Sequence, residues 1–200
     1  MPKIIAVANQ KGGVGKTTTV VNLASSLARR GYQTLVVDLD PQANATSGLG
    51  VDKQAVESSV YEALLSSVPF YNIIQPLHTE GLFIAPSHPR LSGAEVELVQ
   101  EMAREQKLRQ ALDTVRKEFD WILIDCPPSL GLLTINALTA ADSVLIPLQC
   151  EYYALEGLSQ LTETVSLVRQ NLNPELQIEG VLLTMAVERT KLTQDVSTEV

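Results

Sequence analysis

The sequence has 200 residues, 45% of them apolar and 19% charged, and a formal net charge of −8. This composition predicts a globular protein with the core of one α/β domain, and the negative charge excludes a generally basic nucleic-acid-binding coat while leaving room for a local basic patch. No apolar run approaches the roughly 20 residues that cross a bilayer, and the N-terminus lacks the pattern of a secretory signal, so we expect a cytoplasmic protein with no membrane partner.

Short apolar runs alternate along the chain with longer stretches of helical periodicity. This alternation predicts an α/β fold, with a mostly parallel sheet flanked by helices. The expected strands are 3–9, 33–38, 81–85, 120–125, 143–147 and 178–184, and the expected helices are 17–30, 95–119 and 155–172. Low-complexity linkers and solenoid repeats are not found, so we expect a single domain over residues 1–200.

A glycine-rich loop follows the first expected strand and opens the first expected helix, which is the context that a phosphate-binding loop requires. The loop comprises Gly12, Gly13, Val14, Gly15, Lys16, Thr17 and Thr18. Glycines let backbone N–H groups turn toward anionic oxygens, and the helix start adds unpaired amides. We expect Lys16 to contact the β- and γ-phosphates of a nucleotide and Thr17 to ligate Mg²⁺. The plain alternative is a glycine-rich turn that caps the helix.

Gln10 and Lys11, which precede this loop, depart from the usual sequence pattern of a phosphate-binding loop. Gln10 stands where a glycine is common, and Lys11 is a second lysine five residues before Lys16. Charge and geometry explain Lys16 alone, because one lysine is enough to hold one triphosphate. Within one subunit Lys11 is a surplus cation, and a solvated surface lysine is its simplest interpretation.

The second expected strand ends at Asp38 and runs into the segment DLDPQANATSGLG. Its loop of small polar residues is able to rearrange around a γ-phosphate. Asp40 is placed to position or polarise an attacking water, although an aspartate before Pro41 is also a common turn residue.

The helix expected over 95–119 has an apolar stripe along a charged surface. The stripe consists of Leu98, Met102, Leu108, Leu112 and Val115. The strand that follows, in FDWILIDCPPS, ends at Asp125 before a stiff Cys-Pro-Pro turn. Asp125 is placed to hold a magnesium-bound water, as Walker B aspartates do. An ordinary strand-end aspartate is the alternative.

At the end of the chain, Leu192, Val196 and Val200 have the spacing of a helix, and the sequence stops there without a capping residue. We therefore expect the chain to be truncated within an element, with C-terminal elements missing.

Four separated motifs carry a family resemblance: KGGVGKTTT, DLDPQANATSGLG, DCPPSLGLLTINAL and IPLQCEYYALEGLSQL. Their order resembles the ParA/Soj chromosome- and plasmid-partition ATPases, in the deviant Walker A class of P-loop NTPases. The resemblance implies ATP and Mg²⁺ as cofactors and an ATP-dependent homodimer that binds DNA nonspecifically on the nucleoid. It also implies ATP hydrolysis that is slow until a ParB-type protein stimulates it.

Residue by residue, the resemblance implies further roles. Lys11 is similar to the signature lysine that reaches the partner subunit's nucleotide, which makes Lys11, Lys16 and Asp40 the catalytic set. Asp40 matches the switch I aspartate and Asp125 the magnesium-side aspartate of switch II. Arg189 falls where related proteins have a basic residue that contacts DNA, although an exposed loop arginine is the plain alternative. The adenine pocket and most of the DNA surface are expected beyond residue 200.

Three other functions are alternatives to partition. A MinD-type positioning ATPase shares the two-lysine loop, but DPQANATSGLG favours partition, and a MinD-type protein needs an amphipathic C-terminal helix. An iron–sulfur protein like the nitrogenase iron protein needs cysteines at specific sites, and Cys126 and Cys150 do not match that family's motifs. A nucleotide-binding protein without turnover would have no use for Asp40.

Overall fold

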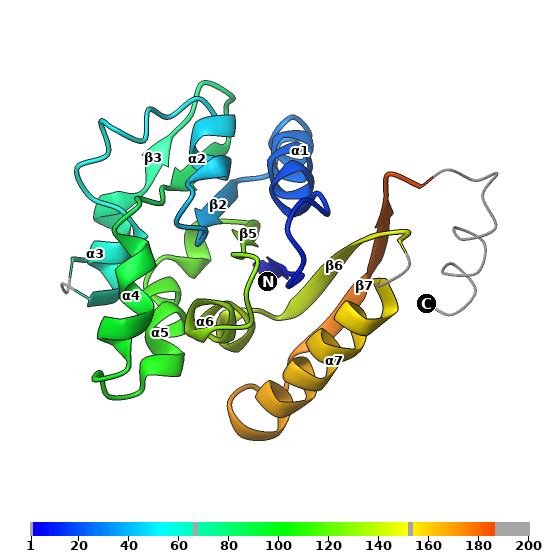
Figure 1. Cartoon of the computed structure of the whole chain (residues 1–200). Helices are drawn as coiled ribbons and strands as arrows, with labels where there is room; N and C mark the ends of the chain where they lie inside the picture. Colours follow the sequence, from blue (N-terminus) through cyan, green and yellow to red (C-terminus); the bar gives the residue numbers. More distant parts are fainter. Residues whose placement is uncertain (1, 66–67, 152–153, 187–200) are drawn as a thin grey trace.

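The centre of the molecule is a seven-stranded sheet with the strand order β3-β4-β2-β5-β1-β6-β7 (Figure 1). It is seen in a computed structural model that describes residues 2–65, 68–151 and 154–186. The strands are β1 (Lys3–Val7), β2 (Thr34–Asp38), β3 (Gln75–Pro76), β4 (Leu82–Ala85), β5 (Trp121–Asp125), β6 (Ser143–Gln149) and β7 (Gln177–Thr184). Neighbouring strands run parallel except for β3 with β4. The six predicted strands are confirmed, and the two-residue β3 was not predicted.

Helices cover both faces of the sheet. They are α1 (Lys16–Ala28), α2 (Asn44–Gly48), α3 (Val60–Leu65), α4 (Leu91–Leu98), α5 (Lys107–Asp113), α6 (Leu132–Ala140) and α7 (Ala154–Asn171), with 3-10 turns at Phe70–Ile73, Arg104–Gln106 and Arg116–Glu118. Figure 1 shows α1 and α2 on one side of the sheet and α6 and α7 on the other. Because both faces are covered, a central strand such as β2 is buried at every position, which explains its continuous apolar run.

Two buried clusters hold these layers together. On the α1 side, Val20 and Ala24 pack against sheet residues such as Leu123. On the opposite side, Leu98 of α4 and Val165 of α7 belong to the larger cluster. Burial of these side chains is the main favourable contribution to folding.

The single helix predicted over 95–119 is wrong. The chain leaves α4 at Leu98 and turns through Ala103, which has a left-handed φ of 51°, before α5 begins at Lys107. Asn136 of α6 explains the break, since its Oδ1 accepts from the N–H of Leu108 at 3.1 Å and its Nδ2 donates to the carbonyl of Arg104 at 2.8 Å. These tertiary hydrogen bonds replace helical ones. Met102, expected on the apolar stripe, is 90% exposed.

The other two predicted helices are confirmed as α1 and α7, with ends that differ by at most two residues. The prediction missed α2, α3 and α6. The helix expected around residues 192–200 lies outside the described residues. None of the described helices is both long enough and apolar enough to span a membrane.

Candidate nucleotide-binding site

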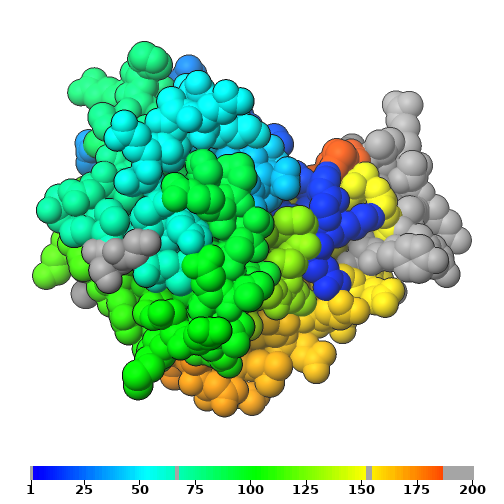
Figure 2. Space-filling view, turned by 60° about the vertical axis from the view of Figure 1, so that its left-hand side comes forward, coloured from blue at the N-terminus to red at the C-terminus, as the bar shows by residue number. Residues whose placement is uncertain are grey.

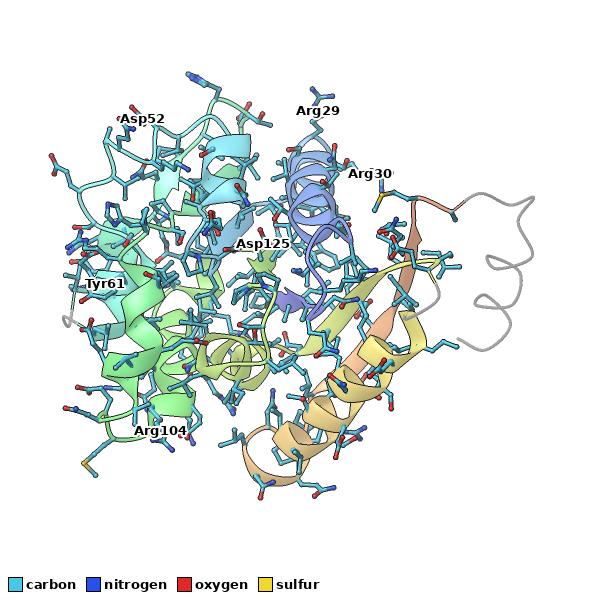
Figure 3. The ribbon with its side chains drawn as sticks, viewed as in Figure 1. Arg29, Arg30, Asp52, Tyr61, Arg104 and Asp125 are labelled. Carbon is cyan, nitrogen blue, oxygen red and sulfur yellow. The ribbon has the colours of Figure 1, made fainter. Side chains whose placement is uncertain are left out.

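The carboxyl ends of three neighbouring strands bring the candidate residues together. In the ladder, Asp125 at the end of β5 lies beside Val7 of β1 and beside Asp38 of β2. Parallel strands end at one edge of a sheet, and ligands of open α/β sheets bind at that edge. Figure 3 shows Asp125 near the centre of the molecule and below α1.

The glycine-rich loop joins β1 to α1 with two left-handed residues. Gly13 has a φ of 76° and Gly15, the residue that caps α1, has a φ of 91°. A side chain at either position would be strained. The loop is also held from β7, because the Thr184 hydroxyl donates to the carbonyl of Val14 at 2.8 Å.

A pocket of about 500 Å³ opens over this loop. It is lined by Gly12, Gly13, Gly15, Lys16, Thr17, Thr18, Asp40, Gln42, Asn44 and Pro128. The structure therefore gathers most of the predicted phosphate-loop residues and Asp40 around one cavity. The side chain of Val14 is buried, and Asp125 is joined to the pocket through its hydrogen bond with Thr17.

The Thr17 hydroxyl donates to Oδ2 of Asp125 at 2.7 Å. Within the described part of the chain, no donor reaches the buried Oδ1 of Asp125. Burial, followed by the negative charge of Asp38, raises the pKa of Asp125 to about 7. A buried carboxylate oxygen without a partner beside a threonine hydroxyl offers the oxygen ligands that Mg²⁺ prefers. The site therefore fits a magnesium ion, held directly or through water.

Lys16 is 7% exposed, and its Nζ donates to the carbonyl of Lys11 at 2.9 Å. Burial lowers the pKa of Lys16, while the carboxylates of Asp125 and Asp40 oppose that shift. A buried ammonium group that faces a glycine-lined pocket is arranged to bind an anion.

Asp40 is a turn residue that also lines the pocket. Its Oδ1 accepts from the N–H of Gln42 at 2.9 Å, as a turn residue does, and the residue also lines the pocket at 7% exposure. A carboxylate beside the phosphate loop can orient a water molecule.

Lys11 is not a free surface cation, because it forms an ion pair with Glu151, which follows β6. Their side chains are 40% and 44% exposed. The backbone N–H of Lys11 donates to Oδ1 of Asn9 at 2.9 Å, and Nδ2 of Asn9 donates to the carbonyl of Pro147 at 2.7 Å. Figure 2 shows the dark-blue N-terminal residues at the surface beside yellow residues near the start of α7.

Sequence reasoning gave no role to Asp38, Asn9 or Glu151. Asp38 is fully buried, and burial raises its pKa to about 6. One signal was available, since all three follow or end strands that reach the same sheet edge. Arg189, the predicted DNA contact, lies outside the described residues.

The comparisons with known proteins agree with this geometry. A family model described as "AAA domain" matches residues 2–178. The chromosome partitioning protein ParA of Myxococcus xanthus is 58% identical over 99% of this chain and 70% of its own length. The sporulation initiation inhibitor protein Soj of Bacillus subtilis is also 58% identical, over 100% of this chain and 79% of its own length.

Solved structures give the same result. A Mycobacterium smegmatis structure named cobyrinic acid a,c-diamide synthase, with bound ATP analogue and magnesium, has a TM-score of 0.95 and 43% identity over 100% of this chain and 82% of its own. The ATP complex of McdA from Cyanothece has a TM-score of 0.92 and 25% identity over 99% of this chain and 77% of its own. These ligands agree with the predicted cofactors, ATP and Mg²⁺. The fold, the phosphate loop and these similarities together show that the chain belongs to the ParA/Soj family of P-loop ATPases.

Proposed function

We propose that this chain is an ATP-dependent switch for DNA segregation. In this proposal, Mg-ATP drives the formation of a sandwich dimer that binds DNA nonspecifically, and a ParB-type protein stimulates the hydrolysis that reverses it. Support comes from the partition proteins ParA and Soj, which share 58% of their aligned residues with this chain. The M. smegmatis structure carries a different name, but its sequence is only 43% identical to this chain, so we favour partition.

The observation that carries the proposal is the shared pocket of the glycine loop, Lys16 and Asp40, which lies over the Thr17–Asp125 pair. The N–H groups of the loop and the Lys16 ammonium group would hold the phosphate oxygens. Thr17 and Asp125 would hold Mg²⁺, which neutralises phosphate charge when it is bound. Asp40 would orient the water molecule that attacks the γ-phosphate. Groups around one pocket would thus hold the phosphates, hold Mg²⁺ and orient the water.

We extend the proposal to the whole chain and to its partners. Residues 1–200 form one P-loop ATPase domain, in keeping with the single sheet of the described residues. Lys11 contacts the nucleotide of a second subunit, and Arg189 contributes to a DNA surface through which the dimer associates with the nucleoid. This association is electrostatic, so it should weaken as salt rises.

The test is the change Asp40→Ala, with Asp52→Ala as its matched control. Oδ1 of Asp52 accepts from the N–H of Gln54 at 2.9 Å, the same turn geometry that Asp40 has with Gln42, but Asp52 is exposed and lies outside the phosphate pocket (Figure 3). We expect Asp40→Ala to bind ATP and dimerise while its hydrolysis falls by about 100-fold or more. Asp52→Ala should hydrolyse ATP as the unchanged protein does.

Two measurements decide the outcome. Single-turnover hydrolysis compares the two variants, and sedimentation with ATP, ADP or no nucleotide, repeated with duplex DNA, compares their assembly. Equal rates of hydrolysis in both variants would show that Asp40 is a turn residue with no catalytic role. Dimers that form without ATP, or DNA binding that ignores the nucleotide, would refute the switch.

A further inference from the structure

Ser87 lies outside every motif that the sequence singled out, in the loop between β4 and α4. It is fully buried, and its hydroxyl donates to the backbone carbonyl of Asp40 at 2.7 Å. The bond therefore reaches the peptide group that directly follows the Asp40 side chain.

Ser87 is also joined to the strand end beneath Asp40. Its backbone N–H donates to the hydroxyl of Thr46 at 3.0 Å, and that hydroxyl donates to Oδ2 of Asp38 at 2.7 Å. The N–H of Thr46 reaches the same oxygen at 2.8 Å, and the N–H of Asp40 reaches Oδ1 of Asp38 at 3.1 Å. Ser87, Thr46 and Asp38 are all fully buried, so the network has little access to water.

The loop that carries Ser87 is anchored on its other side. The carbonyl of Pro86 accepts from the N–H of Val60 at 3.0 Å, and Arg90 forms an ion pair of 2.7 Å with Glu62. Because β4 pairs in register with β2, Ser87 and the Asp40 loop leave adjacent strands. Ser87 therefore connects the Asp40 loop to a fixed part of the fold.

We propose that Ser87 is a positioning residue, which holds the Asp40 peptide so that the carboxylate faces the phosphate pocket. This inference rests on the proposed function, in which Asp40 orients the attacking water. Without the Ser87 hydroxyl, the carbonyl of Asp40 loses its link to the loop after β4 and keeps only the local bond from the N–H of Ala43 at 2.9 Å, so the Asp40 loop is no longer fixed to the neighbouring strand end. A displacement of about 1 Å in a reacting group costs about 100-fold in rate. Nucleotide affinity depends on the phosphate loop and should not change.

The test compares Ser87→Ala with Ser92→Ala. The hydroxyl of Ser92 also donates to a nearby backbone carbonyl, that of Pro89 at 2.8 Å, but Ser92 is exposed and has no bond to the Asp40 loop. In single-turnover ATP hydrolysis we expect Ser87→Ala to lower the rate constant about ten- to hundredfold, with the ATP dissociation constant within about twofold. Ser92→Ala should match the unchanged protein.

A double variant separates positioning from general structural damage. If Ser87 acts through Asp40, then Ser87→Ala should cause no further loss of rate in an Asp40→Ala background. A further loss of similar size there, or an unchanged rate in Ser87→Ala alone, would overturn the proposal. If Ser87→Ala does not fold, Ser87→Cys keeps the size with a weaker donor, and an unchanged rate in that variant would also overturn it.

The result also separates this proposal from the proposed function. If the wild-type protein hydrolyses ATP and Asp40→Ala is impaired, the proposed function stands, whichever result Ser87→Ala gives. An unchanged protein without ATP hydrolysis would overturn both.

Discussion

Asp125 is a buried carboxyl group whose charge is only partly compensated, by the Thr17 hydroxyl and the Lys16 ammonium group. Its pKa is raised from the ordinary 3.8 to about 7, so the folded protein binds this proton more tightly than the unfolded chain does. A group of this kind stabilises the fold fully below its unfolded pKa, and the stabilisation is lost as the pH rises through the folded pKa. The residue that prepares the site for a metal thus destabilises the metal-free protein near neutral pH.

We predict that Asp125→Asn removes this pH dependence. In protein without nucleotide or Mg²⁺, the unfolding free energy of the variant relative to the unchanged protein should rise by about 2 kcal/mol from pH 5.5 to pH 8. Urea unfolding at the two pH values measures the difference. Asp52→Asn, in an exposed loop, is the control and should follow the unchanged protein. If the unfolding free energy of Asp125→Asn changed with pH as that of the wild-type protein does, the result would contradict the raised pKa of Asp125.

At the scale of elements, the segment from α4 to α5 is the clearest departure from the sequence pattern. Its apolar residues recur at helical spacing, yet Asn136 of α6 bonds to the backbone at Arg104 and Leu108 and holds the chain in two short helices. Tertiary contacts override local propensity here. One apolar residue of the expected stripe, Met102, is consequently left in solvent.

The single long helix and the observed pair of short helices predict different losses of unfolding free energy when an apolar residue of the stripe is truncated to alanine. Leu108→Ala should lower the unfolding free energy by about 2–5 kcal/mol, because Leu108 is fully buried. Met102→Ala should change it by no more than about 0.5 kcal/mol, because its side chain is 90% exposed. Chemical denaturation measures both. A comparable loss in Met102→Ala would show that the single long helix had been correct.

For the whole molecule, the ion pair of Lys11 with Glu151 bears on assembly. If Lys11 reaches the nucleotide of a second subunit, it must first leave Glu151. Both side chains are partly exposed, and such pairs contribute only about 0–1 kcal/mol. A contact with phosphate would therefore replace the pair at little cost, and the pair would be no barrier to the proposed dimer.

We predict that Glu151→Gln lowers the ATP concentration for half-maximal dimerisation, by up to about fivefold, since the competing pair is lost. Lys11→Ala should abolish the ATP-dependent dimer. Sedimentation in the Asp40→Ala background measures both effects without turnover. Glu179→Gln breaks the similarly exposed pair with Lys3 far from the pocket and should have no effect. Normal dimerisation of Lys11→Ala would refute the proposed contact of Lys11 with the second subunit's nucleotide.

Features that depend on local chemistry can be predicted from the sequence. Apolar runs marked six of the strands, and glycines at positions that need left-handed backbone marked the phosphate loop around Lys16. Contacts between distant groups depend instead on how the strands are ordered in the sheet. Thr17 and Asp125 are 108 residues apart and become hydrogen-bonded because β5 lies beside β1 in the sheet. The bond of Ser87 to Asp40 likewise depends on the neighbouring positions of β4 and β2. Strand order results from packing over the whole chain, so no short stretch of sequence contains it.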